Sequence, residues 1–157
     1  MTVTVWRIGT DTPDYTADDM SGTGAKITGG RWNRKDTPLV YCASNIALAC
    51  LETAVHLGPK GLPLNRILVK VEIPDKIWKA AQVLANPPVG WDALPAGMVS
   101  LDYGTKWCAS KSTALLIVPS TIVPEEMNVL INPEHKDAKK LKATKVRKWT
   151  YDSRIRP

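Results

Sequence analysis

The sequence predicts an α+β fold, a single compact domain in which mixed or antiparallel strands combine with a few helices. Short apolar runs, several of them alternating with period two, outnumber the helical patterns. Their order along the chain is not the regular strand–helix alternation of a parallel sheet. The length of 157 residues suits one core, and residues 1–157 hold no repeat or linker that would divide them, so the basic segment 136–157 is included in this domain.

The strands follow from apolar patterning and from the residues that interrupt it. Residues 66–73 place four β-branched side chains on one face, as in a half-buried strand. Residues 114–118 are continuously apolar, which is typical of a strand covered on both faces, and Pro119 ends its ladder. In chain order, the predicted strands span residues 3–8, 39–42, 66–73, 114–118, 129–131 and 143–150.

One helix is predicted from its N-cap Ser44 to about Leu57, where Gly58 would stop it. Leu48, Leu51 and Val55 would form its inward stripe, which leaves Glu52 at the border of that stripe.

Two further helices are predicted at residues 76–84 and 98–109, although Gly104 is unfavourable inside the second. Residues 9–30 and 85–97 are rich in residues that favour turns and are predicted to be loops.

Composition argues against membrane-spanning and disulfide-rich classes. No apolar run approaches the roughly 20 residues that span a bilayer, and the N-terminal residues lack the features of a signal peptide, so a cytoplasmic location is expected. Cys42, Cys50 and Cys108 form no CxxC pair and are predicted to be small buried apolar residues. With only two histidines, a histidine-rich metal site is excluded, and we expect chemistry without a metal.

The net charge of +6 lies in the last 24 residues. Residues 1–133 carry 12 basic and 12 acidic side chains, whereas residues 134–157 carry nine basic and three acidic ones. Such a segment attracts nucleic acid, an acidic partner protein or a phosphate-bearing ligand, unless it is simply a solvated edge. No helix-turn-helix or zinc-finger spacing accompanies it, so a nucleic-acid-binding module is the weaker interpretation.

Four residues could form a cleft without a metal. Glu52 would be costly at the border of an apolar stripe unless it is paired or lies in a cleft, although a surface carboxylate is the alternative. Arg31 follows two glycines, which would let a phosphate approach both backbone and guanidinium. Tyr41 and Ser120 lie at the ends of predicted strands, where side chains commonly line a site, although core and turn roles are also open.

Several motifs resemble the RES domain, a family named for its Arg, Glu and Ser. The match runs in the family's order over nearly the whole chain, more loosely over residues 76–110. Its motifs are Trp6-Arg7 and residues 21–24, 30–33, 38–41, 51–57, 116–120, 132–135 and 152–154.

This resemblance implies a toxin of a bacterial toxin–antitoxin pair with a fold similar to ADP-ribosyltransferases and with NAD⁺ as substrate. The expected activity is cleavage of the nicotinamide–ribose bond, which depletes NAD⁺ by hydrolysis or phosphorolysis; mono-ADP-ribosylation of a host protein is the alternative. The implied partner is an Xre-like antitoxin that covers the active site, with nucleic acid bound only through it and a toxin homodimer within the complex. A catalytically inactive scaffold that only binds its antitoxin is also compatible with the sequence.

The family positions carry over to Glu52, Arg31, Tyr41 and Ser120 as candidate catalytic residues, with Ser112 as the alternative serine. Glu52 would stabilise the positive charge that develops on the ribose. Arg31 would hold the pyrophosphate, Tyr41 would contact nicotinamide or ribose, and Ser120 would position Glu52 or the ribose. Supporting contacts to the dinucleotide are expected from Trp32, Asn33 and Asn132.

Overall fold

The protein, described here by a computed structural model for residues 1–155, is built on one seven-stranded mixed sheet. The strands are β1 (Thr2–Thr10), β2 (Val40–Ala43), β3 (Arg66–Pro74), β4 (Gln82–Val83), β5 (Leu115–Pro119), β6 (Met127–Ile131) and β7 (Lys142–Lys148). Their order in the sheet is β4-β5-β6-β2-β1-β3-β7. Only β4 and β5 pair in parallel; the other neighbours are antiparallel. The predicted α+β class is therefore confirmed.

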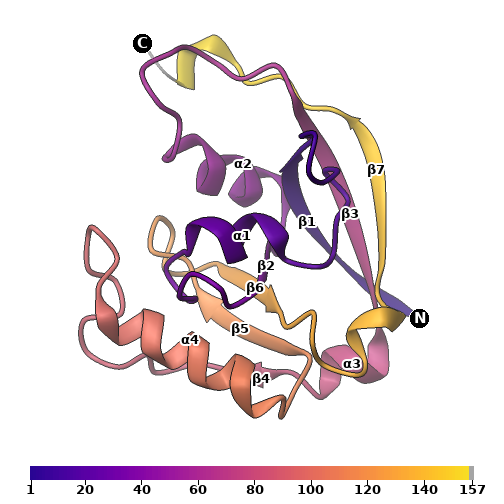
Figure 1. The fold of residues 1–157 in the computed structure, drawn as a ribbon, viewed down its shortest axis with the longest axis vertical. Coiled ribbons are helices and arrows are strands. Elements are labelled where there is room, and N and C mark those ends of the chain that lie inside the picture. The colour runs from indigo at the N-terminus through magenta and orange to yellow at the C-terminus, as the bar shows by residue number, and fades with distance from the viewer. Residues whose placement is uncertain (156–157) are drawn as a thin grey trace.

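The sheet consists of two groups of strands that meet at a narrow junction. β1 pairs with β3 along its whole length, whereas β1 and β2 are joined at a single register pair, Trp6 opposite Ala43. In Figure 1, β1, β3 and β7 run along one side of the molecule, while β5 and β6 lie across it at a large angle. The helix α2 (Ile46–Ala54) directly follows β2 and packs on both β1 and β2, so it covers this junction.

The register places one row of side chains across the junction on the same face of the sheet. Trp6 lies opposite Ala43, Ala43 opposite Asn128, and Asn128 opposite Val118. Residues directly opposite each other in an antiparallel pair project to the same side. This face carries two apolar clusters, one formed with α2 and one with α4 (Met98–Ser110). Asn128 stands between Ala43 of the first cluster and Val118 of the second.

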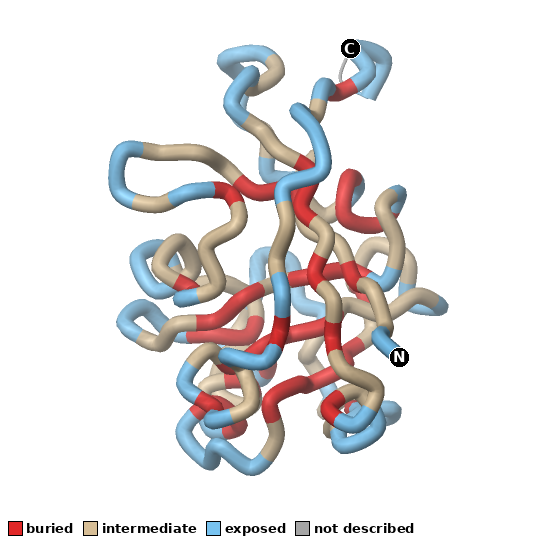
Figure 2. Tube along the Cα trace, turned by 90° about the vertical axis from the view of Figure 1, so that its right-hand side faces the viewer, coloured by how far each residue is buried: buried red, intermediate tan, exposed pale blue. Residues whose placement is uncertain are grey.

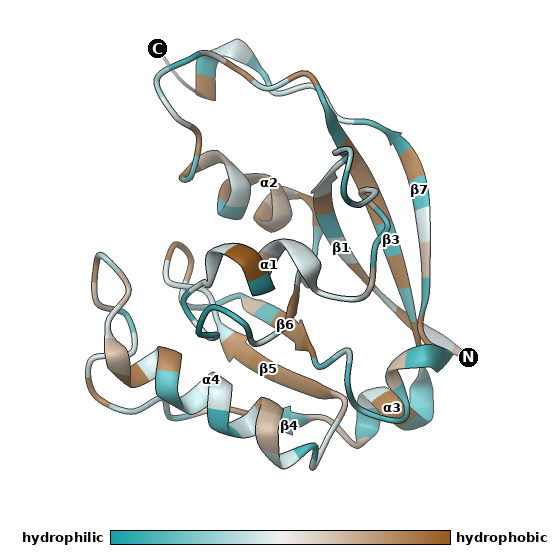
Figure 3. Ribbon diagram, viewed as in Figure 1, coloured by the Kyte–Doolittle hydropathy of each residue, from teal (hydrophilic) through white to brown (hydrophobic). Residues whose placement is uncertain are grey.

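A third apolar cluster covers the opposite face. It contains the alternate residues of the same strands and Ile77 of α3 (Asp75–Lys79). Figure 2 shows buried residues concentrated along the strands and exposed ones in the peripheral loops, and Figure 3 shows hydrophobic residues along β5 and over part of β6. The central strands are thus apolar on both sides, as predicted for residues 114–118.

The orientation predicted for α2 is wrong. Leu51 and Val55 are 39% and 59% exposed, and the buried residues are Leu48, Ala49 and Cys50. Asn45 rather than Ser44 caps the helix, accepting a hydrogen bond from the Leu48 N–H at 2.8 Å, and the helix ends at Ala54. The helix is therefore rotated from the expected stripe.

This rotation changes the position of Glu52. It follows Leu48 by four residues and Ala49 by three, so it shares their side of the helix. Glu52 thus lies on the inward face rather than at its border.

Other differences concern short elements. Residues 9–30 contain the helix α1 (Thr23–Thr28), which is flanked by Gly22 and Gly29 at φ 72° and 71°. The helix predicted at 76–84 ends at Lys79, because the chain then extends to form β4 beside β5. The helix α4 is confirmed despite its glycine. The remaining elements are two short 3-10 turns, η1 (Ala138–Lys140) and η2 (Ser153–Ile155).

The predictions for the cysteines are confirmed. Cys42, Cys50 and Cys108 are free and buried. Burial raises the pKa of the Cys42 thiol to about 12, which keeps it protonated. Within residues 1–155, no helix combines the length and the apolar character needed to cross a membrane.

Gly104 allows α4 to lie against the loop that contains Trp32. A Cβ at this position would overlap the backbone carbonyl of Trp32, which cannot move like a flexible side chain. Gly104→Ala is therefore expected to lower the free energy of unfolding by roughly 1–3 kcal/mol, as overpacking does, although alanine is the better helix former. Urea denaturation measures the change. Gly58→Ala is the control, because a Cβ there meets no atom within 4 Å; equal stability of both variants would contradict the packing argument.

Candidate functional site

The centre of the site is the carboxylate of Glu52 on α2. Its Oε1 accepts a hydrogen bond from Ser120 Oγ at 2.7 Å and another from Asn128 Nδ2 at 2.7 Å. Ser120 directly follows β5 and Asn128 belongs to β6, so three elements meet at one oxygen. Among the residues that the structure describes, none donates to Oε2. The residue as a whole is partly exposed.

The Ser120 hydroxyl has a fixed direction. The residue is fully buried, and its Oγ accepts hydrogen bonds from the backbone N–H groups of Ile122 at 3.0 Å and Val123 at 3.1 Å. A serine hydroxyl has two acceptor lone pairs and one hydrogen. Because both acceptor positions are used, the hydrogen is directed to Glu52. Ser120 therefore accepts from two backbone N–H groups and donates its own hydrogen to the carboxylate. Its oxygen has no free lone pair with which to attack a substrate.

Asn128 was missed by the sequence analysis. It is the polar residue in the apolar strand β6, two positions before the fully buried Leu130 on the same face. The period-two pattern of β6 shows that this uncharged amide occupies an inward position. The pattern does not reveal which residue the amide contacts. Its Oδ1 is buried and accepts no hydrogen bond from the described residues.

Tyr41 in β2 lies on the same face of the sheet, two residues before Ala43. Its hydroxyl donates to Asn33 Oδ1 at 2.6 Å and accepts from the Trp32 N–H at 3.0 Å. Burial raises the pKa of Tyr41 above its ordinary value of 10.0, and the hydrogen bond from Trp32 opposes the rise only in part. The phenol is therefore neutral at physiological pH, and it fixes the loop that follows Gly30.

Trp32 and Asn33 are internal residues of that loop. Trp32 is 2% exposed and stacks on Trp91, with ring centroids 6.2 Å apart. Asn33 is completely buried, and its amide nitrogen donates to the carbonyls of Ala25 at 2.8 Å and Thr37 at 2.9 Å. Their side chains thus hold the loop in place rather than facing the solvent.

Arg31 connects this loop to the long crossing before α4. Its Nη1 donates to the carbonyl of Trp91 at 3.0 Å and to that of Ala93 at 2.9 Å. Its positive charge is close enough to Tyr41 to act against the rise in pKa that burial causes. Within residues 1–155, the Nε and Nη2 groups make no hydrogen bond. The guanidinium is therefore anchored on one side and retains three N–H donors for an anionic ligand.

The remaining predicted residues lie apart from Glu52. Asn132 follows the opposite end of β6 from Asn128; its amide donates to the carbonyl of Cys108 and accepts from the N–H of Glu134, both at 3.0 Å. Ser112 is exposed in the turn before β5. The structure thus brings Ser120, and not Ser112, to the carboxylate.

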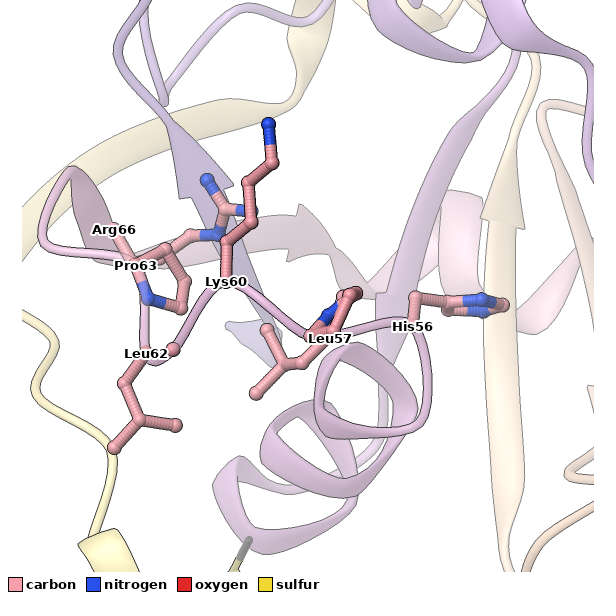
Figure 4. A pocket seen from close by; sticks show the side chains of 9 residues that line it. His56, Leu57, Lys60, Leu62, Pro63 and Arg66 are labelled. Carbon is pink, nitrogen blue, oxygen red and sulfur yellow. The ribbon is translucent and has the colours of Figure 1, made fainter.

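Two other features of the molecule bear on ligand binding. Among residues 1–155, no group of three or more His, Cys, Asp or Glu side chains is arranged to hold a metal ion. A hollow of about 480 Å³ follows α2 and is lined by residues 56–63 and Arg66. In Figure 4, Lys60 and Arg66 lie beside each other there, and His56 points away from them. None of the residues predicted for the site lines this hollow.

Comparisons with known proteins identify the family of this chain. Residues 4–153 match the RES domain, and the chain belongs to this family. The family therefore covers both strand groups and every residue of the site.

Curated relatives match almost end to end. A protein of Sphingobium sp. (strain YBL2) named "Prs ADP-ribosylating toxin" is 61% identical over 157 residues, which cover 99% of this chain and 98% of that protein. A "Toxin Res" of Yersinia enterocolitica is 37% identical over 90% of this chain and 93% of its own length. A "Toxin Res" of Pseudomonas putida is 38% identical over 87% of this chain and 92% of its own length.

The Tyr41 hydroxyl gives a test of the loop. Tyr41→Phe leaves the Trp32 N–H and the side-chain oxygen Oδ1 of Asn33 without their partner, which should lower the free energy of unfolding by roughly 1–3 kcal/mol at neutral pH. Above pH 10 the difference should shrink. The reason is that the wild-type phenol ionises more easily unfolded than folded, so the wild-type protein loses stability there and the variant does not. Denaturant unfolding at several pH values measures both effects.

Tyr15→Phe serves as the control, because the Tyr15 hydroxyl makes no hydrogen bond with the described residues. Equal losses in the two variants, or a constant gap for Tyr41→Phe across the pH range, would contradict this description of the loop.

Proposed function

We propose that this protein is an NAD⁺-consuming toxin that breaks the bond between nicotinamide and ribose. The observation that carries the proposal is the Glu52 carboxylate, held through Oε1 by Ser120 and Asn128, while no donor within residues 1–155 bonds to Oε2. Membership of the RES family and the toxin names of its relatives support the same class of activity.

The chemistry requires stabilisation of a cation. When the C1′–N bond breaks, its electron pair leaves with nicotinamide, and positive charge develops on C1′ and the ring oxygen of the ribose. A fixed carboxylate near this carbon stabilises the charge more in the transition state than in the ground state. The departing nicotinamide is neutral, so no general acid is required. The acceptor then bonds to C1′ and releases its proton, for which Glu52 is the available base.

The other family residues have supporting roles in this proposal. Arg31 would bind the pyrophosphate through the N–H groups that do not contact the crossing. Tyr41 would offer the edge or face of its ring, because its hydroxyl is engaged with Asn33 and Trp32. Ser120 would orient Glu52 and not bond to the ribose.

The two candidate reactions differ in the group that accepts the ADP-ribose. The relative that is 61% identical is named for ADP-ribosylation, which favours transfer to a side chain of a host protein. Hydrolysis or phosphorolysis of NAD⁺ remains the second candidate, because it shares the whole first half of the reaction. The catalytic residues proposed here serve either acceptor.

An antitoxin partner belongs to the same proposal. β7 forms one edge of the sheet and carries exposed basic side chains, several of which lack an acidic partner within the described residues. Lys145 pairs with Asp11 at 3.0 Å and Lys140 with Asp137 at 2.7 Å, whereas Lys142 and Lys148 make no such pair in residues 1–155. This edge suits an acidic surface of an Xre-like antitoxin, with nucleic acid bound through the antitoxin.

Glu52→Gln tests the proposed chemistry. The amide keeps the size of the side chain but removes the negative charge, so release of nicotinamide from NAD⁺ should fall by roughly 10²- to 10³-fold. Chromatography of the products measures the rate, and thermal unfolding checks that the variant is folded. Glu72→Gln on β3 is the matched control and should react at the wild-type rate. Normal turnover by the Glu52 variant would remove this carboxylate from the mechanism.

The acceptor is identified with NAD⁺ labelled in its adenylate phosphate. In an extract of bacteria that lack the toxin, we expect label to become attached to a protein in the presence of wild-type toxin and not of Glu52→Gln. Gel electrophoresis followed by mass spectrometry detects the modified protein. Label recovered only as free ADP-ribose or its phosphate would instead establish degradation.

A further inference from the structure

We infer that Asn128 is a positioning residue that, together with Ser120, fixes the rotation of the Glu52 carboxylate for the proposed reaction. The inference rests on the proposed function, and it assigns a role to a residue outside the Arg, Tyr, Glu and Ser set.

The first argument is the direction of the amide. An ionised carboxylate can only accept hydrogen bonds, so the group that faces Glu52 Oε1 at 2.7 Å must be the NH₂ of Asn128. The Ser120 hydroxyl donates to the same oxygen at 2.7 Å. Both strong positions on Oε1 are then used by protein donors, and Oε2, to which no residue of 1–155 donates, is the oxygen left for the substrate.

The second argument is mechanical. The last torsion of a glutamate side chain has broad minima, so an unsupported carboxylate rotates easily. Here one donor, Ser120, directly follows β5 and the other, Asn128, lies in β6. These two strands pair directly, and the turn between them is closed by the Ser120 N–H and the Glu126 carbonyl at 2.9 Å. Two donors held in this way that converge on one oxygen suppress the rotation.

The third argument is that the strand itself does not require an asparagine. Asparagine is unfavourable in strands, and the partners of Asn128 across the sheet are Ala43 and Val118. Its Oδ1 is buried and accepts no hydrogen bond from residues 1–155, which also costs stability. The only side-chain hydrogen bond that it makes to the described residues is the one to Glu52. Asn128 is therefore costly for the stability of the fold, and its hydrogen bond to Glu52 is the role that we assign to it.

Two substitutions test the inference. Asn128→Asp keeps the shape of the side chain but removes the donor, and Asn128→Val replaces it with a good strand former. In the valine variant, kcat for nicotinamide release should fall about 10- to 100-fold, the range that corresponds to losing one hydrogen bond to a charged group. In the aspartate variant it should fall at least as far, because the new carboxylate also repels Glu52. KM for NAD⁺ should change much less, because Asn128 acts through Glu52 and not on the ligand. Thermal unfolding should show that the valine variant is folded, because the better strand former offsets the lost contact with α2. Asn65→Asp, on an exposed loop, adds the same charge and should react as wild type.

A second measurement separates positioning from a structural role. In the Glu52→Gln background, Asn128→Val should cause no further loss of kcat, since the charge on which Asn128 acts is already gone. An equal loss in both backgrounds, or wild-type kcat in both Asn128 variants, would overturn the inference while leaving the proposed function intact. If the wild-type protein releases no nicotinamide even when a bacterial extract supplies protein acceptors, the proposed function fails and this inference fails with it.

Discussion

The hydrogen bonds that Glu52 Oε1 accepts from Ser120 and Asn128 are the interaction on which the site depends. The three residues are far apart in the chain, with Glu52 separated from its partners by 68 and 76 positions. A carboxylate on an inward helix face must be compensated, and these donors compensate one of its oxygens, while no residue of 1–155 donates to the other. The same contacts hold α2 against β5 and β6, so the chemistry and the packing of this region share one constraint.

The helix that carries Glu52 is held from its other side as well. Tyr151 lies 98 positions from Thr53, and the two hydroxyls are 2.6 Å apart. Thr53 uses its hydrogen on the Cys50 carbonyl at 3.0 Å, so the Tyr151 hydroxyl donates to it. β1 and β2 meet at only one register pair beneath this helix. The C-terminal residues therefore stabilise the place where the two groups of strands are joined most weakly.

The loop of residues 30–33 shows how neighbouring residues in one motif do different work. Arg31 is partly exposed and spans to the crossing before α4, whereas Trp32 and Asn33 point inward and support Tyr41. A Cβ at Gly30 would lie 2.6 Å from the Tyr41 hydroxyl, so glycine is needed for this close approach. In the proposed function a ligand would contact the Arg31 guanidinium, and the other residues of the loop would determine the position of that guanidinium.

The sequence by itself determined the α+β class, most of the strands and the RES family, because period-two patterning and local motifs are properties of adjacent residues. It also pointed to Glu52 and Ser120 through their positions in those motifs. It failed for the buried face of α2, because Leu51 and Val55 look inward by spacing, and only packing on the sheet decides which face is covered. Likewise, the sequence did not show why position 104 is a glycine, because the reason is its contact with the backbone carbonyl of Trp32, which is far away in the chain. The contact between Asn128 and Glu52 could not be predicted for the same reason. The pairing of β6 decides which residues lie beside Asn128, and the contact with Glu52 exists only once α2 has folded over the junction.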